Sequence, residues 1–115
     1  MTINEVLEVV VDPENSHKFI VAELSDGNGG KRLVVRAPKY VRYELHADIL
    51  EFLQKEVGSS GLKARCIGGG VISINTEKKT IKIWDDSGEF GEEPDRQETI
   101  RMLQVAFPEF SVTSF

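Results

Sequence analysis

The sequence predicts an α+β fold in which two helices pack on one mixed, mostly antiparallel sheet of about six strands. Short runs of β-branched and apolar residues occur before residue 38 and again between residues 62 and 84. Two longer stretches have apolar residues at helical spacing. The order of these segments does not suit repeated βαβ units, which argues against a parallel sheet. A chain of 115 residues is long enough for one core, so we expect residues 1–115 to form a single domain.

The first three strands are predicted from short apolar runs. Residues 6–11 are mostly β-branched and end before a proline, which predicts a buried strand. Residues 14–16 are typical of a turn. Residues 19–24 and 32–37 predict two further strands, and the glycine-rich loop 25–30 between them predicts a hairpin.

The first helix is predicted to begin within residues 43–49, with His46 near its N-terminus. Glycine and serine at 58–61 predict its end. One apolar stripe falls at helical spacing and consists of Leu45, Ile49, Leu50, Leu53 and Val57.

The second half of the chain contains three consecutive glycines between two β-like runs, residues 62–67 and 71–75. These runs are two strands or one long bent strand, because glycine permits a bend or a bulge. A polar turn at 76–79 and a strand at 80–84 complete a second hairpin.

The chain is expected to end with a helix and a last strand, residues 111–115. The second helix is predicted to begin at Pro94 or Asp95 and to end before Pro108. Its predicted buried stripe consists of Ile100, Leu103, Ala106 and Phe107.

Charge and composition exclude several classes of function. The chain has 14 basic and 19 acidic residues, a net charge of −5, which argues against binding to nucleic acids or anionic membranes. Cys66 is the only cysteine, so no internal disulfide can form. The first residues do not resemble a signal peptide, and no apolar run has the length of a membrane span. We expect a cytoplasmic monomer.

His46 is the strongest candidate for chemistry that the residues themselves offer. Imidazole can act as a base or a nucleophile near neutral pH. The N-terminus of a helix favours the neutral ring and offers unpaired N–H groups to an anion. The alternative is a half-buried histidine that only caps or packs. His17 is expected to be exposed to solvent, and the two histidines lack acidic neighbours at metal-binding spacing.

Three other features are weak on their own. Cys66 lies in an apolar strand, which favours packing over reactivity. The triple glycine lacks the residues of a phosphate-binding loop, so a sheet bend is preferred. The loop around Ser87 follows a strand and could bind an anion through backbone N–H groups, as many glycine-bearing loops can.

Three motifs occur together in the chain. They are LHADI at 45–49, CIGGGVIS at 66–73 and FPEFSVT at 107–113. In this combination the chain resembles the Janus/Ocnus family over nearly its whole length. The resemblance implies a protein phosphohistidine phosphatase that uses neither a metal nor another cofactor and acts on a phosphohistidine-containing protein.

The same resemblance implies the residues of the site. His46 corresponds to the catalytic histidine, acting as a base or a nucleophile. Phosphate would bind the N–H groups of His46 and Ala47, the loop containing Ser87 and Glu89, and the ammonium group of Lys18. The N–H group of Glu89 could bind phosphate with its side chain turned outward.

The chain departs from the phosphatase pattern at three positions in these motifs or site residues. Val71 replaces a basic residue after the triple glycine, Leu45 replaces a tyrosine, and Glu89 replaces a small apolar residue. Acidic residues near a phosphate site oppose binding of a dianion. An alternative function is therefore a catalytically weak or inactive Janus/Ocnus-like module that binds phosphate or protein.

Overall fold

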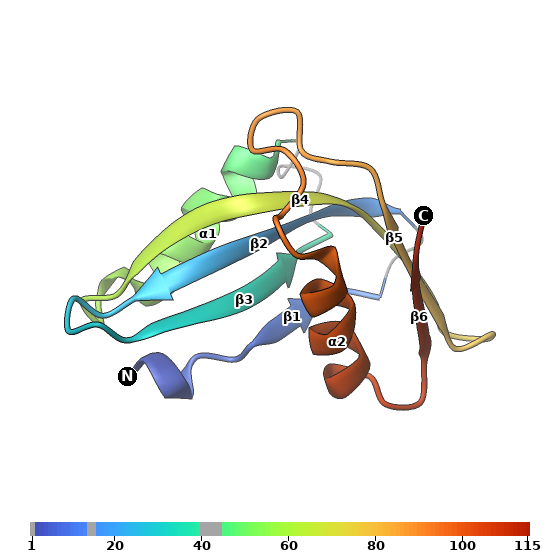
Figure 1. The fold of residues 1–115 in the computed structure, drawn as a ribbon, viewed down its shortest axis with the longest axis horizontal. Helices are drawn as coiled ribbons and strands as arrows, with labels where there is room; N and C mark the ends of the chain where they lie inside the picture. Colours follow the sequence, from blue (N-terminus) through green and yellow to red (C-terminus); the bar gives the residue numbers. More distant parts are fainter. Residues whose placement is uncertain (1, 14–15, 40–44) are drawn as a thin grey trace.

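The computed structural model describes residues 2–13, 16–39 and 45–115. In this part of the chain, six strands form one sheet in the order β1-β3-β2-β4-β5-β6 (Figure 1). The strands are β1 Val9–Val11, β2 His17–Ser25, β3 Lys31–Ala37, β4 Lys63–Asn75, β5 Thr80–Trp84 and β6 Ser111–Ser114. The helices are a 3₁₀ turn at Ile3–Glu5, α1 His46–Gly58 and α2 Arg96–Ala106.

The pairing confirms a mixed, mostly antiparallel α+β sheet. The central pairs β2–β3, β2–β4 and β4–β5 are antiparallel, and both predicted hairpins are present. The outer pairs β1–β3 and β5–β6 are parallel. The two strands of each parallel pair are separated along the chain by another element, β2 between β1 and β3 and α2 between β5 and β6.

The predicted first strand at residues 6–11 is too long and too buried. Only β1, Val9–Val11, forms a strand, because residues 6–8 are an irregular segment between the 3₁₀ turn and β1. Val10 is 40% exposed, since β1 lies at the edge of the sheet. Residues 14 and 15 of the predicted turn, and residues 43 and 44 of the predicted helix start, lie outside the described residues.

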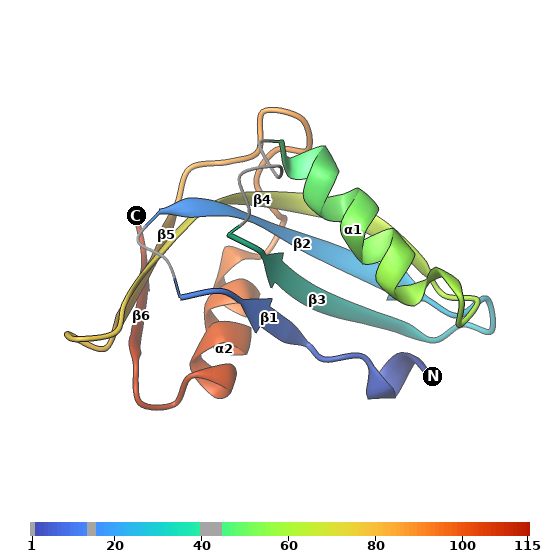
Figure 2. The same cartoon turned by 180° about the vertical axis from the view of Figure 1, so that it is seen from behind.

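The two helices cover opposite faces of the sheet (Figure 2). Alternation along β2 supplies both cores, because successive side chains point to opposite faces. Phe19 and Val21 join the core under α2, whereas Ile20 and Ala22 join the core under α1. Neither helix in the described ranges has the length and apolar run needed to cross a membrane.

The predicted stripe of α2 is partly wrong. The buried residues of this helix are Thr99, Met102 and Leu103. Ala106 is exposed, and the helix ends before Phe107. Leu103 is in the core, and Ile100 and Phe107 are partly buried against it, as predicted. The prediction was wrong for Ala106 and missed Thr99 and Met102.

The triple glycine lies within one continuous strand, so the sequence alternative of a single long strand is correct. The ladder between β2 and β4 skips Ile67, directly before these glycines, which confirms the predicted irregularity. A Cβ atom at Gly69 would lie 2.2 Å from the carbonyl oxygen of Phe19. A Cβ atom at Gly70 would lie 2.4 Å from the carbonyl oxygen of Trp84. Neighbouring backbone therefore approaches β4 more closely here than a side chain would allow.

A buried arginine ties α1 to the sheet. Arg36 on β3 is 2% exposed, and its guanidinium group donates two hydrogen bonds to the Glu56 carboxylate, at 3.2 and 2.9 Å. The same group donates to the carbonyl oxygen of Val35 at 3.0 Å. Paired, two-pronged contact of this kind is stronger than a single ion-pair contact. It holds α1, and with it His46, at a fixed place on the sheet.

Replacing Glu56 with alanine should lower the free energy of unfolding by about 1–3 kcal/mol, because a buried guanidinium group loses its main partner. Urea denaturation followed by circular dichroism measures this change. Glu51→Ala on the same helix is the matched control, since both side chains of the Glu51–Lys55 ion pair are largely exposed. That change should stay within about 0.5 kcal/mol. Equal effects of the two substitutions would contradict the anchoring role of Arg36.

Candidate functional site

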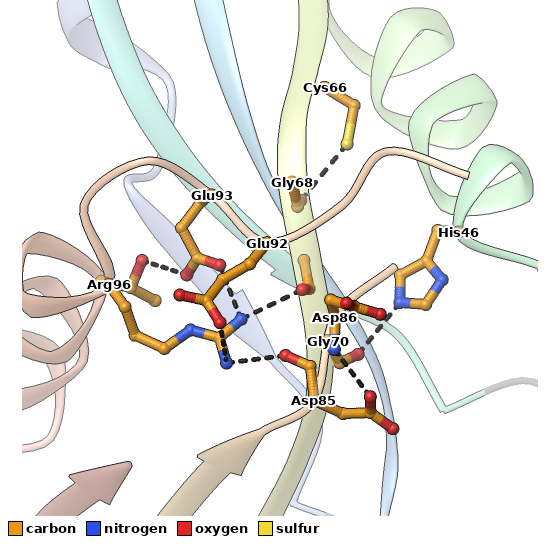
Figure 3. Close-up of polar contacts among 11 residues, drawn as sticks. His46, Cys66, Gly68, Gly70, Asp85, Asp86, Glu92, Glu93 and Arg96 are labelled. Carbon is orange, nitrogen blue, oxygen red and sulfur yellow. Dashed lines mark hydrogen bonds and ion pairs between the residues drawn. The ribbon is translucent and has the colours of Figure 1, made fainter. Parts of the chain in front are cut away.

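His46 is the first residue of α1 and is held against β4. Its side chain is 5% exposed, and its Nε2 atom lies 3.0 Å from the carbonyl oxygen of Gly70. A carbonyl oxygen only accepts, so Nε2 carries the ring proton in this contact. The lone pair of the neutral ring is then on Nδ1. Figure 3 shows Nε2 directed at Gly70 and the other ring nitrogen turned away from it.

Local sequence explains why the helix starts at this histidine. Leu45 is the N-cap and has an extended backbone. Its N–H group donates to the Asp48 carboxylate at 3.1 Å, which is half of a capping box. A Cβ atom at Gly69 would lie 3.2 Å from Cδ2 of His46. The absence of side chains along this part of β4 therefore lets the imidazole ring lie close to the strand.

The exposed Glu89 side chain is turned toward the helix terminus. The N–H group of Ala47 donates to its Oε1 atom at 3.3 Å. The residue is exposed, but its carboxylate lies against the helix terminus and does not leave the Ala47 N–H group free. A carboxylate is attracted there because the helix N-terminus carries a partial positive charge and unpaired N–H groups. The contact is exposed to solvent, so it can be exchanged for a different anion.

Ser87 organises the loop that carries Glu89. It is 1% exposed, and its Oγ atom accepts hydrogen bonds from the N–H groups of Glu89 and Phe90, at 3.2 and 3.1 Å. Its own N–H group donates to the carbonyl oxygen of Gly91 at 3.1 Å. These N–H groups thus bond within the loop. Phosphate binding by Ser87 and Glu89 stays a prediction, and it requires exchange of these bonds.

Lys18 lies on the face of the sheet that also carries α1. Lys18 is the second residue of β2 and pairs with Val71, the residue after Gly70. Alternation places Lys18 on the same face as Ile20, which packs under α1. Its side chain is partly buried. The register therefore brings Lys18 to the same end of β4 as His46, and its role with phosphate remains a prediction.

Sequence reasoning missed Arg96, the first residue of α2. Its Nη2 atom donates to the carbonyl oxygen of Gly69 at 3.1 Å, and its Nη1 atom donates to that of Asp85 at 2.7 Å. It also pairs with the Glu93 carboxylate at 2.7 Å, and Figure 3 shows this cluster beside the His46–Gly70 contact. The carboxylate of Glu93 also accepts from the Thr99 hydroxyl group at 2.5 Å.

One signal in the sequence could have revealed this cluster. A cation in the first turn of a helix is disfavoured by the helix dipole. Arg96 follows the N-cap Asp95 directly, so its side chain needs a partner outside the helix. Its partners are the Glu93 carboxylate and backbone carbonyl groups of β4 and of the loop after β5, and no side-chain pattern encodes the carbonyl groups.

Cys66 carries a partly buried thiol that takes no part in the candidate site. Burial raises the pKa of its thiol to about 11, and the carboxylates of Glu89 and Glu93 act in the same direction. The thiol donates to the carbonyl oxygen of Gly68 at 3.3 Å. A protonated thiol is a poor nucleophile, which agrees with the packing role expected from the sequence.

His17 is not the exposed histidine that the sequence suggested. It is the first residue of β2 and is partly buried, and its Nε2 atom lies 2.9 Å from the carbonyl oxygen of Ala37. Its place at the end of the β2–β3 hairpin explains the contact. It therefore has a structural hydrogen bond, as His46 does, but away from a helix terminus.

The fold and the position of His46 define a class of small α+β protein with a candidate anion site where α1 meets β4. Residues 3–111 match the model of the Janus/Ocnus family. The chain belongs to this family.

Its relatives include the sex-regulated protein janus-A of Drosophila melanogaster, 33% identical over 104 residues, which cover 90% of this chain and 75% of that protein. Janus-A of Drosophila pseudoobscura pseudoobscura is 35% identical over 109 residues, with 90% and 71% covered. The 14 kDa phosphohistidine phosphatase of Sus scrofa is more distant, 25% identical over 115 residues, with 95% and 89% covered.

Alkylation of Cys66 by iodoacetamide should be slow at neutral pH and should reach half its maximal rate near pH 11, where the thiol loses its proton. The urea-unfolded chain is the control, and its midpoint should lie near the ordinary thiol pKa of 9.0. Mass spectrometry of samples quenched over time gives both profiles. A native midpoint at or below that of the unfolded chain would show that the thiol is activated and not merely packed.

Replacing Glu89 with glutamine should lower the Kd for inorganic phosphate by about 3- to 10-fold, because a carboxylate no longer competes with a dianion at Ala47. The Ala47 amide resonance in ¹⁵N NMR titrations reports this binding. Asp86→Asn is the matched control: it removes the same charge from the same loop, and Asp86 makes its described contact with Asp85 through its backbone. A comparable gain from both substitutions would mean that overall charge, and not the contact at Ala47, limits phosphate binding.

Proposed function

We propose that this chain is a protein phosphohistidine phosphatase that hydrolyses the P–N bond without a metal and uses His46 as its base or nucleophile. The observation that carries this proposal is the contact between Nε2 of His46 and the carbonyl oxygen of Gly70. It fixes the proton on one ring nitrogen and the lone pair on the other. A phosphatase of this kind needs such a lone pair beside an anion site.

Two courses are open to the Nδ1 atom of His46. As a base, it takes a proton from water while the water oxygen bonds to phosphorus and the P–N bond breaks. As a nucleophile, it bonds to phosphorus itself, and water then hydrolyses the phosphorylated His46. In both, the substrate imidazole leaves with the electron pair of the P–N bond and gains a proton. The products are phosphate and an unmodified histidine.

Phosphate would bind where the Glu89 carboxylate now lies. The N–H group of Ala47 donates to that carboxylate, so this donor already holds an anion. A phosphoryl oxygen would replace it and would gain from the same helix terminus. The ammonium group of Lys18 would add a positive charge from the neighbouring strand. Such preorganised donors stabilise charge that develops on phosphorus oxygens.

Family membership and the pig phosphatase support this proposal. The relation to that enzyme is distant, at 25% identity, but the alignment covers 95% of this chain. The janus-A relatives are nearer in sequence, and their names state no reaction. The proposal therefore depends on the chemistry at His46 and must be tested there.

Phosphate release from a histidine-phosphorylated protein should be lost, by about 100-fold or more, when His46 is replaced with glutamine. Glutamine can still donate a hydrogen bond to Gly70 but has no basic nitrogen. His17→Gln is the matched control, because it makes the same change at a second histidine that is bonded to a carbonyl group. It should retain activity near that of wild type.

Equal release by wild type and His46→Gln would overturn the proposal. Rapid quenching followed by mass spectrometry separates the two courses. A phosphorylated peptide containing His46 identifies the nucleophile, whereas its absence during turnover identifies the base.

The alternative function, a binding module with little or no catalysis, is favoured by one observation. Glu89 occupies the donor of Ala47, and Val71 supplies no positive charge beside it. This alternative predicts that millimolar phosphate leaves the amide resonances of His46, Ala47 and Ser87 unmoved. A phosphohistidine peptide or a protein partner would then shift other resonances. Large phosphate-dependent shifts at these three amides favour the enzyme.

A further inference from the structure

We infer that Arg96 is a positioning residue for His46: it fixes the glycine segment of β4 whose carbonyl oxygen holds the catalytic imidazole. The inference deepens the proposed function and rests on it for the effect on catalysis. Its effect on the imidazole itself can be measured separately. Arg96 lies on α2, on the opposite face of the sheet from His46.

The glycine segment does little by itself to fix the orientation of its peptide groups. Gly68, Gly69 and Gly70 have no side chains, so their backbone angles are less restricted than those of other residues. The strand ladder also ends here on one side, because β5 pairs with β4 only from Val71 to Asn75. On the other side β2 pairs with all three glycines. The peptide groups that face the β5 side therefore need hydrogen bonds from outside the ladder.

Arg96 and the loop supply those hydrogen bonds. The carbonyl oxygen of Gly69 accepts from Nη2 of Arg96, and the N–H group of Gly69 donates to the carbonyl oxygen of Gly91 at 3.1 Å. A Cβ atom at Gly70 would lie 3.2 Å from the same Nη2 atom, so the guanidinium group lies beside the face of the strand from which Gly70 lacks a side chain. The adjacent peptide group carries the oxygen that accepts from His46. A rotation at Gly69 would move that oxygen.

The same guanidinium group fixes the start of the loop that reaches the anion site. Its Nη1 atom donates to the carbonyl oxygen of Asp85, directly after β5. Asp85 has a φ of 66°, a backbone conformation that residues other than glycine rarely adopt. Two residues later comes Ser87, which orients Glu89. Arg96 thus joins the strand that holds His46 to the loop that faces it.

The surroundings of Arg96 keep this side chain in place. Its side chain is 9% exposed, and the Glu93 carboxylate beside it is 1% exposed. Glu93 in turn is held by Thr99 from the next turn of α2. The Phe19 ring lies 5.6 Å from the guanidinium carbon and packs against it. An arginine fork can donate to several acceptors in fixed directions, whereas a lysine ammonium group is a single point of charge.

The test compares three variants. Arg96→Lys keeps the charge beside Glu93 but cannot reach both carbonyl oxygens. Glu93→Gln removes the buried charge but keeps Arg96 and an oxygen that accepts from it. It therefore shows how far a less stable protein, with Arg96 still present, changes the His46 ring. Arg101→Lys makes the same exchange on the same helix at an exposed residue bonded to Glu98. Circular dichroism shows that each variant is folded.

The first readout is the imidazole ring of His46, observed by ¹⁵N NMR with long-range proton correlation. We expect wild type, Glu93→Gln and Arg101→Lys to show the Nε2–H tautomer at His46. Arg96→Lys should show a mixture of the two tautomers, because the acceptor at Gly70 is no longer fixed. The second readout is hydrolysis of a phosphohistidine protein, where Arg96→Lys should lower kcat by about 10- to 100-fold and change KM by less than about twofold.

An Arg96→Lys variant with the tautomer and kcat of Arg101→Lys would overturn the inference. If the wild type releases no phosphate but Arg96→Lys still changes the tautomer of His46, the proposed function is wrong and the positioning role stands. If Arg96→Lys does not fold, the pair Glu93→Gln and Arg96→Met removes both charges together. It should show the same loss of the Nε2–H tautomer, and a wild-type tautomer in this pair would equally overturn the inference.

Discussion

The hydrogen bond between His46 and the carbonyl oxygen of Gly70 is the contact on which the candidate site depends. It joins α1 to the central strand and selects which ring nitrogen keeps its lone pair. The sheet provides the strand, Arg36 and Glu56 hold the helix, and the glycines allow the ring to come close. If this bond were absent, a histidine at the start of the helix would still be present but would have no fixed tautomer.

The triple glycine has two physical consequences in this structure. It admits backbone and side chains that a Cβ atom would exclude, from β2, from the loop after β5 and from α1. It also removes the side-chain restrictions that normally stiffen a strand. The glycines therefore allow close approach but leave the strand less rigid. The hydrogen bonds of Arg96 and Gly91 to Gly69 compensate for the lost rigidity.

The site contains opposing charges, which bear on how it would treat a substrate. The helix terminus and Lys18 favour an anion, whereas Glu89 already places a carboxylate on the Ala47 N–H group. A phosphoryl group would have to displace that carboxylate. Such a site would bind phosphate more weakly than one with a small apolar residue at this position, and Glu89 would make it selective for groups that gain more from the helix terminus than a carboxylate does.

The sequence by itself determined the fold class, most of the strand and helix positions and the prominence of His46, because these follow from local periodicity, glycine and proline positions and a family motif. It did not determine the contact of Glu89 with the helix terminus, the burial of Thr99 on α2 or the cluster around Arg96. Those features depend on which backbone carbonyl and N–H groups lie within reach once the sheet and the helices have packed. Every residue carries these same groups, so the order of side chains does not encode their partners, and only the tertiary structure decides them.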